Sequence, residues 1–306
     1  MSEHVRSLAE LRHSDEAQFG GKSAGLGELL AAGIAVPPGF ALSCSAYELA
    51  GRDGPMPELV RDEVARAYAE LGDDRAVAVR SSAVGEDSAE ATFAGQQETV
   101  LWVRGVDHVC EAIRACWGSL YSPTAIAYRA RLGDGAREPA MGVAVQVMVD
   151  PVVAGVLFTC NPVTGDPSMV AINASWGLGV SVVGGEVTPD EYLVSKVTGE
   201  VVRERIGSKE IEYVHEPGAR GTVKRDVSTD RRAARCLDRA AIAALLDAAR
   251  AIERHFGAAQ DVEWALAADG LLVLQSRPVT ALPERDRASK PASALSLVMK
   301  TFGARS

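Results

Sequence analysis

The chain has 306 residues, of which 47% are hydrophobic and 24% charged, and its formal net charge is −9. This composition predicts a globular protein with enough length for one large domain or two lobes. The negative charge argues against a broad nucleic-acid-binding surface, since such surfaces need Lys and Arg to meet the phosphates.

Neither secretion nor membrane insertion is expected. Residues 1–15 have no apolar core of the kind found in a secretory signal. The longest apolar run, AMGVAVQVMV, is about half the length that spans a bilayer. The five cysteines are odd in number and show no CxxC spacing, which predicts reduced and mostly buried thiols. We therefore expect a cytoplasmic protein with no membrane partner and no nucleic-acid partner.

In the first half of the chain, helices and strands are expected without strict alternation. In order, they are a helix at 24–32, a helix at 57–71, strands at 76–82 and 98–103, a largely helical stretch at 107–131, and two apolar strands between 141 and 160. Gly33 follows the first helix at the position that favours a left-handed C-cap. The continuous apolar runs between 141 and 160 predict strands buried on both faces.

Beyond residue 190 the pattern changes to shorter strands and charged loops. One long amphipathic helix is expected at 231–256, because its apolar positions fall on one face, and Gly257 ends it. The face consists of Leu237, Ala241, Leu245, Ile252 and Phe256. A pair of strands, VEWAL and LLVLQSR, follows.

Together these elements predict an α+β fold in a single domain over 1–283. We expect two lobes, at about 1–190 and 191–283, because shorter strands and charged loops replace the apolar strands after residue 190. The polar residues 284–306 are expected to form a loosely attached tail.

Lys22 lies in GGKSAGLGEL, which looks at first like a phosphate-binding loop. A Walker A loop, GxxxxGK[ST], would need a glycine where this chain has Glu16, and it would follow a buried strand, whereas HSDEAQ is polar. The Walker A interpretation therefore fails on both counts. Two alternatives stay open from the local sequence, a phosphate-binding lysine or a lysine of a surface turn.

Arg80 ends a buried strand, where a guanidinium costs desolvation energy unless an anion meets it. The anion is either a bound phosphate or a nearby carboxylate, Glu86 or Asp87. In TFAGQQETV, Gly95 permits close backbone approach and Thr99 offers a hydroxyl to a phosphate or a metal. The alternative is an ordinary glycine-containing entry to a strand.

Gln146 interrupts an otherwise apolar strand. A buried amide needs partners, because an unsatisfied one costs roughly 1–3 kcal/mol. Either an adenine edge or the backbone would satisfy it.

The hairpin QDVEWALAADGLLVLQSRP carries oxygen donors whose relative placement depends on its turn. With a two-residue turn at 269–270, Glu263 and Gln275 would face opposite sides of the hairpin. We predict instead a three-residue loop at 268–270, with Gly270 left-handed, which places Glu263 directly opposite Gln275.

In this register Asp261 and Arg277 share a face. Two oxygen donors, Glu263 and Gln275, beside a guanidinium suit Mg²⁺ bound to phosphates, since Mg²⁺ takes a few protein oxygens and completes its shell with phosphate oxygens. The alternative is a salt-bridged hairpin on the surface.

Five motifs occur in one order along residues 19–280: GGKSAGLGEL, VRSSAVGEDSAEATFAGQQET, VLFTCNPVTGD, GGEVTPDEY and FGAAQDVEWAL…LQSRPVT. In these motifs the sequence resembles the ATP-binding N-terminal domain of the phosphoenolpyruvate synthase, pyruvate phosphate dikinase and rifampin phosphotransferase superfamily. The resemblance implies an ATP-grasp fold, in which two α+β lobes clamp ATP. It also implies ligand roles for eight residues: Lys22 and Arg80 on phosphates, Gly95 and Thr99 in a loop over the phosphates, Gln146 near adenine, Glu263 and Gln275 on Mg²⁺, and Arg277 on the transferring phosphates.

In the resembled family the nucleophile is a histidine on a separate swivelling domain. No Thr-x-x-His loop is present, and the five histidines lie in none of the matched functional motifs. The expected function is therefore the ATP-binding subunit of a split dikinase-type phosphotransferase, which phosphorylates a histidine on a separate carrier protein, releases AMP and works with an acceptor-binding subunit. Two alternatives remain, a non-catalytic ATP-binding regulatory module and direct phosphorylation of an acceptor with ADP release.

Overall fold

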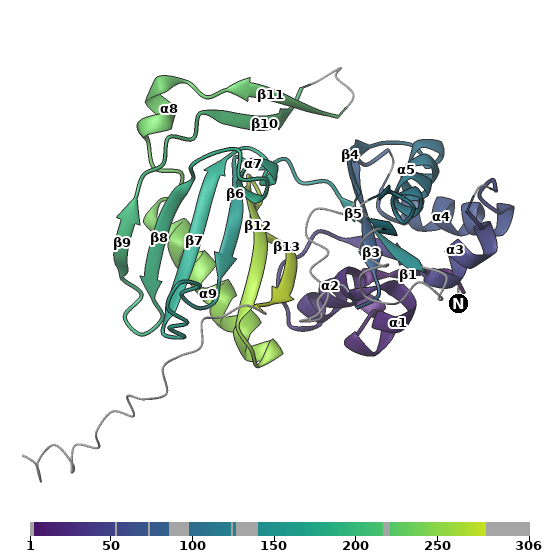
Figure 1. Cartoon of the computed structure of the whole chain (residues 1–306), viewed down its shortest axis with the longest axis horizontal. Helices are drawn as coiled ribbons and strands as arrows, with labels where there is room; N and C mark the ends of the chain where they lie inside the picture. Colours follow the sequence, from purple (N-terminus) through teal and green to yellow (C-terminus); the bar gives the residue numbers. More distant parts are fainter. Residues whose placement is uncertain are drawn as a thin grey trace, which may run out of the picture.

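The computed structural model describes residues 3–279 except 53, 73, 86–97, 124, 127–139 and 217–220. Over these residues the chain forms two lobes, each built on an antiparallel sheet with helices packed against it (Figure 1). The predicted α+β class is confirmed, in the two-lobed arrangement expected of an ATP-grasp fold. In this described part of the chain, no helix has the length and apolar character needed to cross a bilayer.

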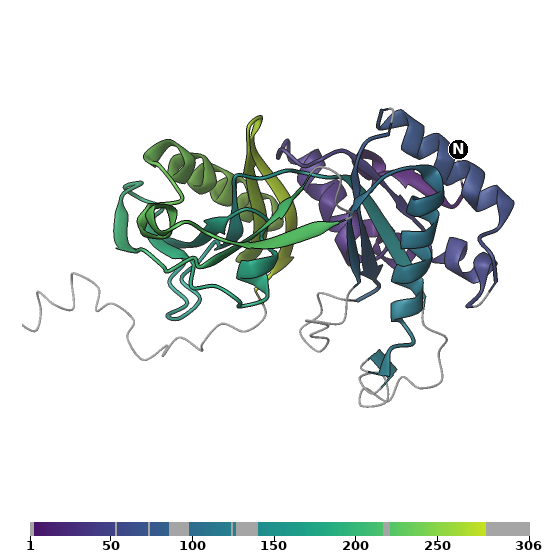
Figure 2. The ribbon, with the colours of Figure 1, turned by 90° about the horizontal axis from the view of Figure 1, so that it is seen from above.

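The first sheet, in the N-terminal lobe, has the strand order β1-β2-β5-β3-β4 over the described residues. Its strands are β1 Val5–Ser7, β2 Gly39–Leu42, β5 Met141–Val147, β3 Val77–Ala83 and β4 Thr99–Val103. The helices of this lobe are η1 Leu8–Glu10, η2 His13–Asp15, α1 Glu16–Phe19, α2 Gly21–Ala31, α3 Cys44–Ala50, α4 Glu58–Glu70 and α5 Val106–Ser119. α4 and α5 lie on one side of the sheet and α2 on the other (Figure 2).

Both faces of β5 are buried, as its apolar sequence predicts. On β5, Val143 and Val145 pack into the core beneath α3, α4 and α5, whereas Ala144 between them belongs to the core around α2. Successive strand residues point to opposite faces, so a strand with a core on each side contains no polar alternation.

The second sheet has the order β13-β12-β6-β7-β8-β9 over the described residues. Its strands are β6 Val153–Phe158, β7 Met169–Trp176, β8 Asp190–Ser195, β9 Val201–Arg205, β12 Gln260–Ala267 and β13 Gly270–Pro278. The other elements of this lobe are α7 Val180–Val183, α8 Thr229–Ala233, α9 Arg239–Phe256 and the ribbon of β10 Ile211–His215 and β11 Thr222–Asp226. α9 covers one face of the sheet (Figures 1 and 2).

The chain passes from the first sheet to the second between β5 and β6, near residue 150. The change of sequence pattern near residue 190 had suggested a later boundary. β8 begins at Asp190 but pairs with β7, so both belong to one sheet. The change in sequence after residue 190 reflects the sheet's outer edge, because β9 is exposed along its whole length. An exposed edge strand loses the apolar character of the central strands without starting a new lobe.

The helix expected at 231–256 is two helices, α8 and α9, with a break before Asp238. The Asp238 side chain accepts a hydrogen bond from the Ala241 backbone at 2.8 Å and caps α9. Aspartate at this position satisfies backbone donors that a continuing helix would otherwise have bonded. Gly257 ends α9 with φ of 68°, as predicted.

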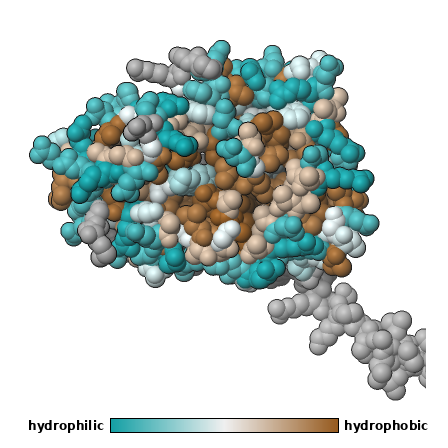
Figure 3. Space-filling model, turned by 180° about the vertical axis from the view of Figure 1, so that it is seen from behind, coloured by the Kyte–Doolittle hydropathy of each residue, from teal (hydrophilic) through white to brown (hydrophobic). Residues whose placement is uncertain are grey.

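The N-terminal helix α2 joins the two lobes. Its Leu26 and Leu29 share one core with Trp264 of β12 and Ile252 of α9. Beyond its end, the Ala35 carbonyl accepts a hydrogen bond from Val273 of β13 at 2.8 Å. On the face opposite that of Figure 1, apolar side chains gather across the middle of the molecule inside a polar rim (Figure 3). Residues close to the N-terminus thus complete the core of the C-terminal lobe.

The ribbon of β10 and β11 extends from the second lobe toward β4 (Figure 1). His215 of β10 stacks on Trp102 of β4, with ring centroids 4.0 Å apart and an interplanar angle of 18°. Trp102 has φ of 61°, a backbone conformation that costs energy for a bulky residue. The ribbon is therefore a second bridge between the lobes.

The five cysteine thiols are free and buried, as the sequence predicts. Burial raises the pKa of Cys44 to about 11 and that of Cys116 to about 12. Because the thiolate is the reactive species, we expect none of the five to react with a disulfide reagent at pH 8 in the native protein, and all five to react after unfolding. Counting released thiolate against time measures this, and a native thiol that reacts at the rate of a free cysteine would contradict the burial.

Candidate functional site

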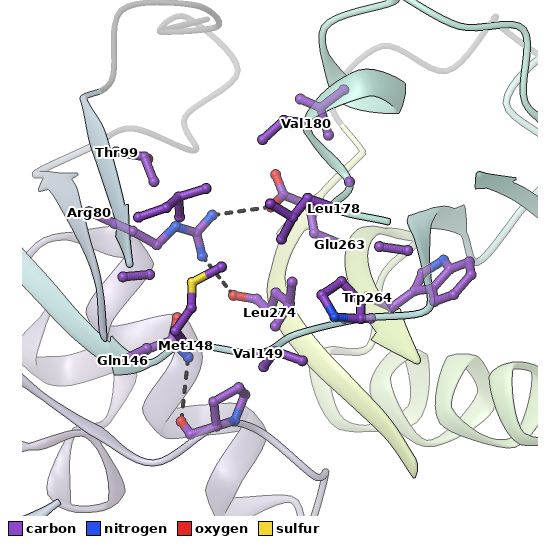
Figure 4. Close-up of a pocket in the computed structure, with 18 of the residues that line it drawn as sticks. Arg80, Thr99, Gln146, Met148, Val149, Leu178, Val180, Glu263, Trp264 and Leu274 are labelled. Atoms are coloured by element: carbon purple, nitrogen blue, oxygen red, sulfur yellow. Dashed lines mark hydrogen bonds and ion pairs between the residues drawn. The ribbon is translucent and has the colours of Figure 1, made fainter. Parts of the chain in front are cut away.

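A cavity of about 380 Å³ lies between the two sheets and is lined mainly by apolar side chains. Ala78 and Leu101 contribute from the first sheet, and Ala154 and Ala265 from the second. The chain segment 146–149, where the first sheet gives way to the second, forms part of the wall (Figure 4). An apolar cavity with a few polar groups at one side is the usual form of a small-molecule site.

The Arg80 guanidinium crosses from the first lobe to the second at the polar side of this cavity (Figure 4). Its Nη2 donates to Glu263 Oε2 at 3.1 Å and to Gln275 Oε1 at 2.7 Å. Its Nη1 donates to the Leu274 carbonyl at 2.8 Å. Arg80 was expected at the end of a buried strand but lies in the middle of β3, and its charge is balanced across the cavity by a carboxylate from β12.

Glu263 and Gln275 lie directly opposite each other, as predicted. The predicted three-residue loop is nevertheless wrong. Ala267 pairs with Gly270, so the turn contains only the two residues 268–269. From that turn alone, Glu263 would have faced away from Gln275.

A β-bulge at Leu274 restores the predicted register. Trp264 pairs with Val273 but Glu263 pairs with Gln275, so Leu274 is the extra residue on β13. Bulges re-aim nearby backbone and side-chain groups, and here the carbonyl of the extra residue is the one that accepts from Arg80. The bulge thus creates both the pair of oxygens and the third contact of the guanidinium.

Asp261 and Arg277 are also direct strand partners, two residues along each strand from Glu263 and Gln275. Arg277 donates to Asp261 Oδ2 from Nε at 3.0 Å and contacts it from Nη2 at 2.9 Å. Burial raises the pKa of Asp261, and the positive charge of Arg277 opposes that shift. The Arg277 side chain is half-exposed, and its action on phosphates stays a prediction.

Lys22 is not a lysine of an exposed turn, because only 4% of it is exposed. It lies in the first turn of α2, and its Nζ donates to the Ser81 carbonyl at 2.7 Å. Gly20 allows α2 to approach β3 this closely, since a Cβ there would lie 2.0 Å from the Ser82 carbonyl oxygen. Lys22 thus contacts the residue next to Arg80, although it is not among the residues that line the cavity.

Two of the other predicted residues line the cavity. Thr99 is the strand partner of Arg80 and lies at the same polar side. Gln146 is buried, with its Nε2 3.5 Å from the Pro37 carbonyl, so the backbone alternative accounts for part of its hydrogen bonding. Gly95 lies outside the described residues, as do Glu86 and Asp87.

The oxygens of Glu263 and Gln275 fit a magnesium ion. In the described part of the chain no three His, Cys, Asp or Glu side chains gather in a way that could hold a metal. Mg²⁺ in nucleotide sites is typically held by only one or two carboxylates together with the phosphates. The guanidinium of Arg80 contacts both oxygens, which shows that the two face one cationic group.

Two features of the cavity were not predicted from the sequence. One is the Leu274 carbonyl, since an apolar residue in a strand carries no signal that its backbone will be turned outward. The other is the GLGV turn, whose Leu178, Gly179 and Val180 line the cavity. Its glycines were the available signal, and Gly177 has φ of 71°.

Comparisons with known proteins match the chain over most of its length. Residues 50–295 match the family model of the pyruvate phosphate dikinase AMP/ATP-binding domain. The chain is 38% identical to a probable phosphoenolpyruvate synthase of Methanothermobacter thermautotrophicus, over 93% of this chain and 47% of that protein. It is also 38% identical to a rifampicin phosphotransferase of a Streptomyces species, over 92% of this chain and 37% of that protein. It therefore spans less than half the length of these two relatives. Among solved structures, acetyl-coenzyme A synthetase 1 of Ca. Korarchaeum cryptofilum matches with a TM-score of 0.43 and 12% identity, over 83% of this chain and 90% of that one.

Proposed function

Because the chain belongs to the pyruvate phosphate dikinase AMP/ATP-binding domain family, we propose that it binds Mg·ATP between its lobes and phosphorylates a histidine on a separate carrier protein. Two phosphates leave ATP, one to the carrier histidine and the other to water or inorganic phosphate as the second acceptor, so that AMP is the nucleotide product. An acceptor-binding subunit then receives the phosphate from the carrier. We place this reaction in the cytoplasm, which supplies ATP and keeps thiols reduced.

The observation that carries the proposal is the convergence of Arg80 with Glu263 and Gln275 beside an apolar cavity. The cavity suits a flat, mostly apolar base, with Gln146 at one wall. Its polar side combines a cation with oxygen donors, which is what a magnesium-bound polyphosphate requires.

The roles of the side chains follow from the electrostatics of phosphoryl transfer. Lys22, Arg80 and Arg277 supply positive charge to the phosphate oxygens, and positive charge stabilises the transition state by meeting the charge that develops there. Thr99 and Gly95 are proposed to contact the phosphates. Mg²⁺, when bound through Glu263 and Gln275, neutralises and orients the phosphates.

The phosphorylated histidine is proposed to come from another protein. All five histidines are described, and none lines the cavity. His255 contacts Glu28 at 2.8 Å, and His215 stacks on Trp102. Both are occupied in contacts that hold elements of the fold together.

The nucleotide product tests the proposal. The protein is incubated with Mg²⁺ and ATP labelled at the α-, β- or γ-phosphate, with and without candidate carrier proteins. AMP together with an acid-labile phosphohistidine on the carrier is the expected result. ADP with a phosphorylated acceptor would instead indicate direct transfer, and tight ATP binding without turnover with any carrier would indicate a regulatory module.

A further inference from the structure

The two oxygens that suit a magnesium ion are already occupied by a positive charge of the protein itself. Arg80 Nη2 lies 3.1 Å from Glu263 Oε2 and 2.7 Å from Gln275 Oε1. One nitrogen atom is thus shared between the two oxygens that would hold a divalent cation.

We propose that Arg80 is a built-in counter-cation, which holds Glu263 and Gln275 until a nucleotide draws the guanidinium onto its phosphates, so that the divalent cation binds only together with the nucleotide. This inference rests on the proposed function, because it concerns the same site. It adds an order to the binding events and a second role for Arg80.

The guanidinium and a metal ion exclude each other at this position. Glu263 carries one negative charge, and its ion-pair partner among the described residues is Arg80. A divalent cation placed beside the bound guanidinium would be repelled by it, since like charges a few ångströms apart repel strongly where water is scarce. The Arg80 side chain is only 12% exposed, so solvent screens this repulsion little.

Three contacts on the second lobe hold the guanidinium at this position. Nη1 donates to the Leu274 carbonyl at 2.8 Å, and Nη2 makes the two side-chain contacts. Arg80 itself is on β3 of the first lobe, so these hydrogen bonds also link the lobes. Without nucleotide, a metal ion would have to break three hydrogen bonds and leave the guanidinium with no anion.

A bound triphosphate removes this cost. Its oxygens carry several negative charges and accept bidentate hydrogen bonds from a guanidinium, which are stronger than those to a neutral carbonyl or amide. Glu263 and Gln275, released by Arg80, would then be free to hold Mg²⁺. Each negative group keeps a positive partner throughout the exchange, and the affinities for metal and nucleotide become coupled.

Manganese binding without nucleotide tests the inference. We measure free Mn²⁺ by electron paramagnetic resonance while titrating wild type and the Arg80→Gln variant in the absence of nucleotide. The expected result is one Mn²⁺ site in Arg80→Gln, with an affinity at least about tenfold higher than any Mn²⁺ binding by the wild type. Adding Glu263→Ala to Arg80→Gln should abolish that site. Wild type that binds Mn²⁺ alone as tightly as Arg80→Gln would overturn the inference, and so would an Arg80→Gln variant that gains no site.

Two further variants serve as controls. Arg277→Gln also removes one positive charge paired with a carboxylate of the same hairpin, but that carboxylate is Asp261, so no Mn²⁺ site should appear. Arg80→Lys keeps the charge, should still exclude Mn²⁺, and tests the inference if Arg80→Gln does not fold. If Arg80→Lys opens the site as fully as the neutral variant does, the charge is not what excludes the metal.

Wild type that binds Mn²⁺ alone but also binds Mn·ATP would overturn this inference only, whereas absence of any ATP binding would overturn the proposed function.

Discussion

Replacing Glu263 with alanine is expected to weaken Mg·ATP binding about 10- to 100-fold, a range typical for groups that support a bound metal. This corresponds to about 1.4–2.7 kcal/mol of binding free energy. The same change should leave the affinity for metal-free ATP at least as high as in the wild type. The reason is that the carboxylate serves the metal, and its removal also releases the Arg80 guanidinium, which Glu263 holds at 3.1 Å, for the phosphates.

Isothermal titration with ATP in the presence of Mg²⁺ and in the presence of EDTA measures both affinities. Glu253→Ala is a matched control, because Glu253 has the same side-chain exposure of 29% and pairs with Lys196 as Glu263 pairs with Arg80. Glu253 is on α9, away from the cavity, so its loss should change neither affinity. An equal loss with and without Mg²⁺ in Glu263→Ala would show that the carboxylate acts on the fold and not on the metal.

The pairing of Glu263 with Gln275 was predicted from the sequence, but the feature that produces it was not. A three-residue loop and a two-residue turn followed by a one-residue bulge shift the register by the same amount. Beyond the bulge, the predicted and the observed hairpin have the same strand pairing, so the predicted neighbours of the polar residues were correct. Between the turn and the bulge the pairings differ. In that part the apolar run LLVL contains no residue whose type would indicate a bulge.

The assignment of strands to sheets could not be predicted from local patterns. Alternation and apolar runs report how deeply a strand is buried, and β5 and β6 were both expected to be buried. Their partners are set by contacts far along the chain, since β6 pairs with β12 about a hundred residues later. The burial of Lys22 has the same origin, because it depends on Gly20 meeting Ser82 of β3.

The second large effect is expected on stability and concerns a buried ion pair outside the cavity. Lys209 Nζ lies 2.5 Å from Asp190 Oδ1, and both side chains are completely buried. Asp190 also accepts hydrogen bonds from the backbone of Gly207 at 2.9 Å and of Cys236 at 2.8 Å. One carboxylate thus ties the start of β8 to the segment that enters the β10–β11 ribbon and to the chain just before α9.

Lys209→Met is expected to lower the free energy of unfolding by about 3–5 kcal/mol, because it leaves a buried carboxylate without its cation. Lys224→Met is the matched control, since Lys224 also pairs with a carboxylate, Glu186, but both side chains are exposed. An exposed pair contributes little to stability, because solvent screens it. Urea denaturation followed by circular dichroism measures both changes, and a loss below 1 kcal/mol in Lys209→Met would contradict the burial of the pair.

Hydrogen exchange then locates the loss of stability. Because Asp190 joins three segments, protection should fall across β8 and α9 as well as in the ribbon, whereas a loss confined to the ribbon would mean that Lys209 only holds that element in place.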